Sequence, residues 1–393
     1  MFTYYLYLPT EDEKSYHPLR HLLYLTVWKP YLESSPRWIQ SDKDNCDLSN
    51  RDPILNPRKE FPYLPGGGRI FHHIRIFPVT WLTDKVPCAR FLKKNQSPFN
   101  LQTRWEYYPP TFVYDPQNPS LTLRQYQSSQ SKSKSGPTPS PLWYYKPSQG
   151  GGTRGVILSH DFMTLYSYAQ KQLKPSVIQQ EISQPDLSLD RRKYEIRWYV
   201  VFTYQPSYKE LYLWWWNEGY LVLSPKKYSS KNLDTSGHFT NRSTSSDRER
   251  ASQEYQMTLS EAIPRLGVDL NREGHKLIQS LAKRLSQLRL TQNLEPRHYP
   301  EYPQYEVLAV DCIWSNTDQK LSLVEINRYP GLYLSRDTDS CRILKTRFYQ
   351  TVLQDLVEPL LDGRSLHPNS SGTPDTNKIS KIPKNLIGFN LIH

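Results

Sequence analysis

The chain has 393 residues, which exceeds the usual size of one compact core and predicts two or three lobes. Lysine and arginine outnumber aspartate and glutamate by 50 to 38, and the net charge of +12 favours a polyanionic partner or ligand. The four cysteines show no CxxC spacing, which argues against a zinc site or a disulfide framework. No apolar run approaches the roughly 20 residues of a membrane span, and no RNA-recognition, zinc-finger or helix-turn-helix signature is present. We therefore expect a cytoplasmic protein that has no membrane anchor and does not bind nucleic acid.

The first part of the chain, residues 1 to about 110, mixes short aromatic strand patterns with Pro and Gly, and this predicts a small α/β lobe. Within it, residues 82–94 predict a helix that begins near Thr83 or Asp84, with Lys85 in its first turn. Residues 125–141 are rich in Ser, Lys and Pro, so we expect a mobile surface loop there.

A glycine-rich turn follows, flanked by two strand-like runs within residues 142–158. Lys146 ends the first run, and the backbone N–H groups of the glycines after it can approach a phosphate closely. The lysine precedes the glycines and no GK[ST] follows, so this is not a Walker motif. The alternative interpretation is a plain glycine-rich hairpin.

Residues 177–182 predict a strand, and residues 193–202 alternate so that Lys193, Glu195 and Arg197 share one face. Such a face would suit a nucleotide site, because the basic side chains can bind phosphate and the acidic side chain can bind ribose or a metal ion. A solvated sheet face with a cross-strand ion pair explains the same pattern equally simply.

The second half of the chain predicts a hairpin over 211–223 that turns at Asn217 to Gly219, followed by a polar loop over 224–256. His238 and Thr240 lie in this loop, where a lone histidine is ordinarily structural.

Two amphipathic helices are predicted near the carboxyl end, one capped by Asn271 and reaching about Leu290, the other over roughly 341–361. Residues 362–393 resemble a flexible tail in composition, although 386–392 are apolar enough to dock on the protein.

An acidic hairpin over 305–330 is the most informative stretch. Period-two alternation places Asp311 opposite Glu325, with Asn327 two positions further along the same face. Opposed like charges destabilise a sheet, so a cation is expected between them. The oxygen ligands suit magnesium, and a Lys or Arg from elsewhere in the chain is the alternative.

Taken together, the segments resemble the tubulin tyrosine ligase-like family of ATP-grasp enzymes over about residues 80–330. The matching segments, in chain order, are LTDKVPCARFLKK, YYPPTFVY, WYYKPSQGGGTRGVIL, VIQQEISQP, RRKYEIRWYVV, HFTN, VDCIW and LVEIN. The resemblance implies an α/β ATP-grasp fold with two lobes around a nucleotide cleft. We expect a divergent lobe over 1–110, the ATP-grasp core over 111–361 and a tail over 362–393.

The resemblance also assigns roles to individual residues. It implies that Lys85, Lys146, Ser148, Gly150, Gly151 and Gly155 contact phosphates, that the backbone of Gln179, Gln180, Glu181 and Ile182 binds adenine, and that Lys193 and Glu195 lie near the nucleoside. It implies Arg197, His238, Thr240 and Asn241 as catalytic residues, and Asp311, Glu325 and Asn327 as ligands of magnesium.

The activity implied by the resemblance is an ATP- and Mg²⁺-dependent ligase that activates a carboxylate as an acyl phosphate and joins it to the amine of a free amino acid. The expected acceptor is an acidic protein or peptide, with the tubulin tail first among the candidates, and the protein is expected to be a monomer. A ligase for a non-tubulin acceptor, and an inactive pseudo-ligase that binds acidic tails or nucleic acid, are the alternatives.

Three positions depart from the family pattern. Glu181 stands where an aromatic residue is usual, and Glu195 replaces Asp. The pattern Gly-x-Leu-Arg ends here in Val222, so an arginine associated with the reacting groups is missing, and Lys226 or Lys227 are candidates to replace its charge.

Overall fold

The computed structural model describes the main secondary structure of the chain and omits several connecting segments. The described residues are 2–5, 29–40, 48–49, 71–72, 82–93, 105–130, 141–148, 153–208, 210–240, 256–289, 303–327, 330, 337–363, 366 and 389–392. Gly150, Gly151 and Asn241, which the sequence analysis singled out, lie outside them.

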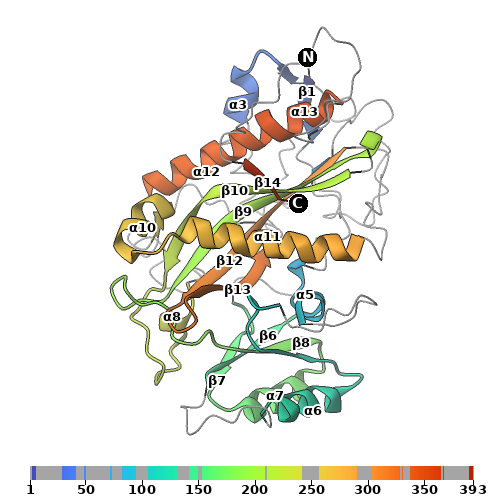
Figure 1. The fold of residues 1–393 in the computed structure, drawn as a ribbon. Coiled ribbons are helices and arrows are strands. Elements are labelled where there is room, and N and C mark those ends of the chain that lie inside the picture. Colours follow the sequence, from blue (N-terminus) through green and yellow to red (C-terminus); the bar gives the residue numbers. More distant parts are fainter. Residues whose placement is uncertain are drawn as a thin grey trace, which may run out of the picture.

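The larger of two main sheets forms the centre of the protein (Figure 1). It contains β4 (Phe71–His72), β9 (Tyr194–Gln205), β10 (Glu210–Leu223), β11 (Gln256–Thr258), β12 (Gln304–Ser315), β13 (Lys320–Asn327) and β14 (Phe389–Ile392). The main path runs β11-β10-β9-β12-β13 and is antiparallel throughout. β14 pairs with the outer side of β10, and β4 pairs in parallel with β12.

Helices cover both faces of this sheet. One face carries α10 (Leu259–Leu266) and α11 (Leu270–Arg289), and the other carries α12 (Asp339–Thr351), the π-helical turn Val352–Val357 and α13 (Glu358–Leu361). Side chains of β9 alternate between the two cores, because Trp198 and Val200 pack toward α11 while Tyr199 and Val201 pack toward α12. Because both faces are buried, residues 198–202 of β9 are continuously apolar.

The smaller sheet lies beside the first and carries the glycine-rich turn. It contains β5 (Thr111–Tyr114), β6 (Trp143–Pro147), β7 (Ile157–Ser159) and β8 (Ser176–Gln180), in the antiparallel order β5-β8-β6-β7. Helices α6 (Pro119–Gln130) and α7 (Phe162–Gln172) pack on it through an aromatic core in which Tyr126 stacks on Phe162. Asp161 caps α7 by accepting from the N–H groups of Met163 and Thr164.

Helix α5 (Lys85–Lys93) confirms the helix predicted around Lys85, and it packs at the junction of the two sheets (Figure 1). Val86, Ala89 and Leu92 enter the core of the larger sheet. This helix, although it lies within residues 1–110, is therefore part of the same core as the later strands.

The described amino-terminal elements form a small α/β unit. It comprises β1 (Phe2–Tyr5), β2 (Trp38–Gln40), β3 (Leu48–Ser49) and α3 (Lys29–Ser34), with three parallel strands in the order β2-β1-β3. Tyr31 and Arg37 both donate to the buried carboxylate of Glu358, at 3.0 and 2.5 Å. These bonds join the unit to α13.

Three local predictions are wrong. Residues 211–223 do not form a hairpin, because β10 pairs with β9 on both sides of a bulge between Trp215 and Gly219 and keeps its direction. Asn271 lies inside α11, and the N-cap contact comes from Asp269, which accepts from the N–H of Arg272 at 3.0 Å. Residues 125–130 belong to α6 and not to a loop.

Two other predictions stand with changes. The carboxyl-terminal helix expected over 341–361 is present but includes the π-helical turn. The predicted tail contains β14, so part of its apolar segment does dock, as a strand on β10. None of the helices in the described part of the chain has the length and apolar character of a membrane span.

Close packing between α11 and Trp198 gives a test of the core. A Cβ atom at Gly274 would lie 2.7 Å from Cζ2 of Trp198, whose side chain is fully buried. Gly to Ala inside a helix ordinarily stabilises by about 1 kcal/mol. We predict that Gly274→Ala instead lowers the free energy of unfolding by about 1–3 kcal/mol, because the indole cannot move aside. Chemical denaturation measures this.

Gln279→Ala is the matched control, since Gln279 is exposed on the same helix. Its effect is expected to stay within about 0.5 kcal/mol. An increase in stability in Gly274→Ala would contradict the close contact.

Candidate functional site

The acidic hairpin has the predicted register. β12 and β13 pair Asp311 with Glu325 and Ala309 with Asn327. The amide of Asn327 donates to Asp311 Oδ2 at 2.7 Å and to Glu325 Oε1 at 2.9 Å. Two carboxylates and an amide therefore meet at one point. Within the described ranges, no group of three or more His, Cys, Asp or Glu is placed to hold a metal.

Cationic side chains compensate this negative charge from within the protein. Arg197 of β9 binds Asp311 through two bonds of 2.6 Å, and Lys85 of α5 lies 3.7 Å from Glu325 Oε2. Burial alone would raise the pKa of Glu325, but Lys85 and Lys146 outweigh it and hold that pKa below its usual range. Lys85 and Arg197 therefore balance the charges of Glu325 and Asp311, as the alternative interpretation expected, and magnesium binding stays a prediction.

The oxygen chemistry still fits a hard divalent ion. The carboxylates of Asp311 and Glu325 converge on the NH2 group of Asn327. Magnesium prefers hard oxygen ligands, so Asn327 would have to turn its amide oxygen toward the ion to join the two carboxylates. Because both oxygens of Asp311 are bonded to Arg197, that guanidinium would have to move for both oxygens to face a metal.

On β9, the predicted polar face is present but is not simply solvated. Lys193 is buried, and Glu195 accepts from the hydroxyl of Thr240 at 2.5 Å. Burial and the charge of Asp311 raise the pKa of Glu195. Glu195, which is bonded to Thr240, therefore lies close enough to the Arg197–Asp311 pair for the charge of Asp311 to act on it.

The smaller sheet contributes a second lysine. Lys146 on β6 donates to Gln179 Oε1 at 2.7 Å, and burial lowers its pKa to about 8. Ser148 links this strand to α5, because its carbonyl accepts from the backbone N–H of Lys85 at 3.4 Å. The Ser148 N–H donates to Pro175. Gly155 has a φ of +74°, which favours glycine, and it lies over Pro147.

The predicted adenine hinge is less open than expected. The N–H groups of Gln180 and Glu181 donate to the carbonyls of Pro110 and Leu142, both at 2.8 Å. Gln179 is paired within the sheet. The backbone N–H groups of Gln180 and Glu181 are therefore already engaged within the protein.

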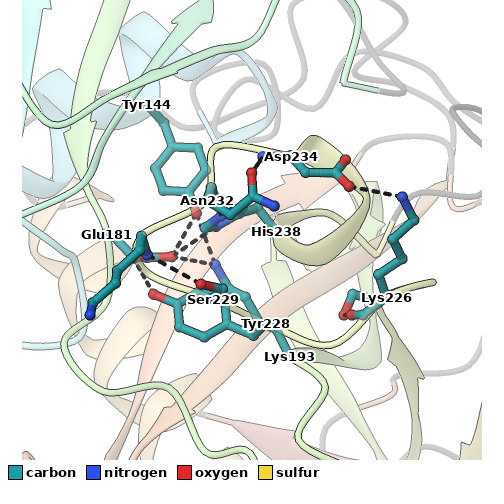
Figure 2. A network of polar contacts seen from close by, with 11 residues as sticks. Tyr144, Glu181, Lys193, Lys226, Tyr228, Ser229, Asn232, Asp234 and His238 are labelled. Atoms are coloured by element: carbon teal, nitrogen blue, oxygen red, sulfur yellow. Dashed lines mark hydrogen bonds and ion pairs between the residues drawn. The ribbon is translucent and has the colours of Figure 1, made fainter.

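The side chain of Glu181 is the centre of a polar network that the sequence did not predict (Figure 2). It accepts from Tyr144 at 2.7 Å, from Tyr228 at 2.8 Å and from Lys193 at 3.0 Å. The ring of His238 is buried, with Nε2 bonded to the carbonyl of Asn232 at 2.6 Å. Tyr144 and Tyr228 were missed, and only the position of Tyr144, two residues before Lys146 on β6, could have indicated that it lies near the site.

The lysines considered as substitutes for the missing arginine lie at the surface. Lys226 pairs with Asp234 at 2.9 Å and Lys227 lies 3.8 Å from Asp190, and both are largely exposed. The buried Lys345 of α12, also missed, lies 4.5 Å from the ring centroid of Tyr220 and pairs with Asp337 at 2.7 Å. Tyr220 is the cross-strand neighbour of Arg197.

Comparison with known proteins assigns this arrangement to a family. The model of the tubulin-tyrosine ligase family matches residues 72–365, which include both main sheets except β14 and Phe71 of β4. The chain belongs to the tubulin-tyrosine ligase family. The ATP-grasp-like mixed α/β fold expected from the sequence agrees with the two antiparallel sheets and their helices.

Individual relatives in the tubulin-tyrosine ligase family are distant. Tubulin glycylase 3D of Tetrahymena thermophila is 24% identical over 234 residues, which cover 56% of this chain and 21% of that protein. Tubulin glycylase 3A of Drosophila melanogaster is 31% identical over 104 residues, covering 25% of this chain and 10% of that protein. The matched regions are therefore only a small part of each of these two relatives.

The lowered pKa of Lys146 predicts a specific pH dependence of stability. The unfolded chain binds this proton up to about pH 10.5 and the folded chain only up to about pH 8. Between these pH values the unfolded state holds more protons than the folded state, so the free energy of unfolding of the wild type rises with pH. Below pH 8 the folded protein carries the full cost of burying the charged lysine. Relative to Lys146→Met, the wild type should gain about 2–3 kcal/mol between pH 7 and pH 10.

Urea denaturation of both proteins at the two pH values measures this gain. Lys171→Met, at an exposed position of α7, is the control and should show no such change. A stability difference between wild type and Lys146→Met that is the same at both pH values would rule out a buried, titrating Lys146.

Proposed function

We propose that this protein is an ATP- and Mg²⁺-dependent ligase that adds an amino acid to a protein or peptide carboxylate. The observation that carries the proposal is a group of three cationic side chains around two carboxylates and an amide. The carboxylates are those of Asp311 and Glu325, and the amide is that of Asn327, where the two sheets meet. Lys85 and Lys146 lie on the side of the smaller sheet, and Arg197 lies on β9 beside Asp311. Positive side chains around two carboxylates of the kind that bind metal ions suit the transfer of a phosphoryl group.

In this proposal, Lys85, Lys146, Ser148 and the glycine-rich turn bind the phosphates of ATP, and Asp311, Glu325 and Asn327 hold magnesium. Magnesium would supply charge neutralisation at the transferring phosphate. Arg197 would move from Asp311 to the phosphate or the reacting carboxylate, and Lys193 and Glu195 would orient the nucleoside. The chain's own contribution is positioning and electrostatic stabilisation while the acyl phosphate forms and the amine attacks.

An acidic acceptor is supported by the formal charge of +12 and by membership of the family. Both relatives are named as tubulin glycylases, so a tubulin carboxyl-terminal tail is the first acceptor to test and glycine the first amino acid. A cytoplasmic location of the protein would fit such an acceptor.

A second candidate is a pseudo-ligase that binds acidic tails without modifying them. It is favoured by Val222, which stands where the family pattern has an arginine, and by the full engagement of Arg197 with Asp311. Turnover separates the two candidates.

The deciding experiment incubates the protein with ATP, magnesium, mixed amino acids and tubulin-tail peptides, and reads peptide mass. We predict a mass increase of one or more amino-acid residues for the wild type. Glu325→Gln should lower the rate about 100-fold or more, because one anionic metal ligand is lost. Glu106→Gln, an exposed position, is the control and should retain the wild-type rate.

The outcome that contradicts the ligase is no modified peptide and no amino-acid-dependent ADP, which supports the pseudo-ligase. A Glu325→Gln protein that melts at lower temperature yet keeps its magnesium-dependent rate would contradict the metal role of Glu325 alone.

Nucleotide binding gives an independent prediction. Lys146→Met should weaken ATP affinity by about 10-fold or more, because a buried ammonium beside the phosphates is lost. Isothermal titration calorimetry with magnesium and ATP measures this, and Lys171→Met should bind as tightly as the wild type. Equal affinity in Lys146→Met would remove this lysine from the proposed phosphate site.

A further inference from the structure

One buried carboxylate joins segments that come from both sheets (Figure 2). Glu181 follows β8 of the smaller sheet, and Tyr144 lies on β6 of the same sheet. Lys193 directly precedes β9 of the larger sheet, and Tyr228 and His238 belong to the segment 224–240 that leads from β10 toward β11. The bonds to Glu181 from Lys193 and Tyr228 therefore cross the junction between the sheets, whereas the bond from Tyr144 stays within the smaller sheet.

The network is shielded from water, so its charged groups interact strongly with one another. The side chains of Glu181 and Lys193 are 9% and 5% exposed, and that of His238 is 1% exposed. Lys193 also donates to the Tyr144 hydroxyl at 3.0 Å, and His238 Nδ1 lies 3.7 Å from Glu181 Oε1. Burial opposes the charge on Glu181, but the charge of Lys193, the nearby His238 ring and the hydrogen bonds from Tyr144 and Tyr228 keep its pKa far below the usual range.

A buried ion pair of this kind is not an efficient source of stability. Its desolvation cost often equals its attraction, and apolar replacements of similar volume can be as stable. The distinctive property of the network is its directionality, since each bond fixes one side chain relative to the same carboxylate. This points to a role in holding segments at defined positions.

The segment 224–240 leads from this network to the polar face of β9. Its backbone is bonded to the start of β9, through Ser224 N–H to Lys193 and Tyr228 N–H to Arg191. Phe239 packs against Tyr144 and Leu158 of the smaller sheet. The next residue, Thr240, donates to Glu195 at 2.5 Å, and Glu195 lies on the same strand face as Arg197.

We propose that Glu181 is a positioning residue which, through its hydrogen bond from Tyr228, fixes segment 224–240 against the smaller sheet and so places Thr240 on Glu195, while its ion pair holds Lys193 beside Tyr144. The part of this inference that concerns nucleotide rests on the proposed function. Glu181 touches neither nucleotide nor acceptor in this role; it acts through Lys193 and Thr240.

The test removes one hydroxyl from the network without leaving a buried charge unpaired. Tyr228→Phe deletes the bond to Glu181 Oε2, whereas Glu181→Gln also removes the charge beside Lys193. Tyr166→Phe is the matched control, because its hydroxyl donates to the Pro119 carbonyl within the smaller lobe, away from the network.

Amide hydrogen exchange is measured first, on the full chain without nucleotide. Tyr228→Phe and Glu181→Gln should accelerate exchange across 224–240 by about 5-fold or more, as expected when a bond to a charged acceptor is lost. Exchange in α7 should not change, and Tyr166→Phe should leave 224–240 at the wild-type rate. Wild-type exchange in 224–240 of Tyr228→Phe would overturn the proposal, whether or not the protein has ligase activity.

Kinetics then separate positioning from general stability. With ATP and magnesium, Tyr228→Phe should raise KM for ATP by about 3-fold to 10-fold and change kcat less than about 2-fold, because uniform binding is lost. Tyr166→Phe should change neither. A fall in kcat at constant KM, or equal effects from both variants, would overturn the positioning role. If the wild type does not use ATP, the result contradicts the proposed function. The exchange experiment alone then tests whether Glu181 holds segment 224–240 in place.

Discussion

Neutralisation of buried charge at the centre of the larger sheet is the constraint on which the site depends. Arg197 and Asp311 lie on the neighbouring strands β9 and β12, and their paired bonds of 2.6 Å satisfy the buried carboxylate of Asp311. Asn327 then connects Asp311 to Glu325, and Lys85 balances Glu325 from α5. These contacts between charged and polar side chains therefore fix the positions of α5 and β13 relative to β9.

Much of this could be predicted from the sequence because strand periodicity is a strong local signal. The alternation in 193–202 places Glu195 and Arg197 on one strand face, and the acidic hairpin places Asp311 opposite Glu325, which the observed register confirms. The helices predicted around Lys85 and after Asn271 are also confirmed. Their apolar stripes are long enough to identify a buried side without knowledge of the partner.

The parts that could not be predicted depend on contacts between distant segments. The turn-like residues Asn217 to Gly219 indicate a hairpin locally, but pairing with β9 on both sides of them keeps β10 continuous. Glu181, Tyr144 and Tyr228 carry no shared motif, and only the fold brings them together. Lys345 is missed for the same reason, because its helix pattern gives no sign that a lysine on it is buried beside Tyr220.

The pairing of β14 with β10 has a consequence for handling the protein. The outer side of β10 is covered by β11 at residues 220–222 and by β14 at residues 213–216. A shortened version that lacks 389–392 would leave the backbone N–H and C=O groups of the 213–216 stretch without that neighbour. A bare strand edge is a template for pairing with another molecule, so such a version would tend to self-associate at the concentrations used for purification.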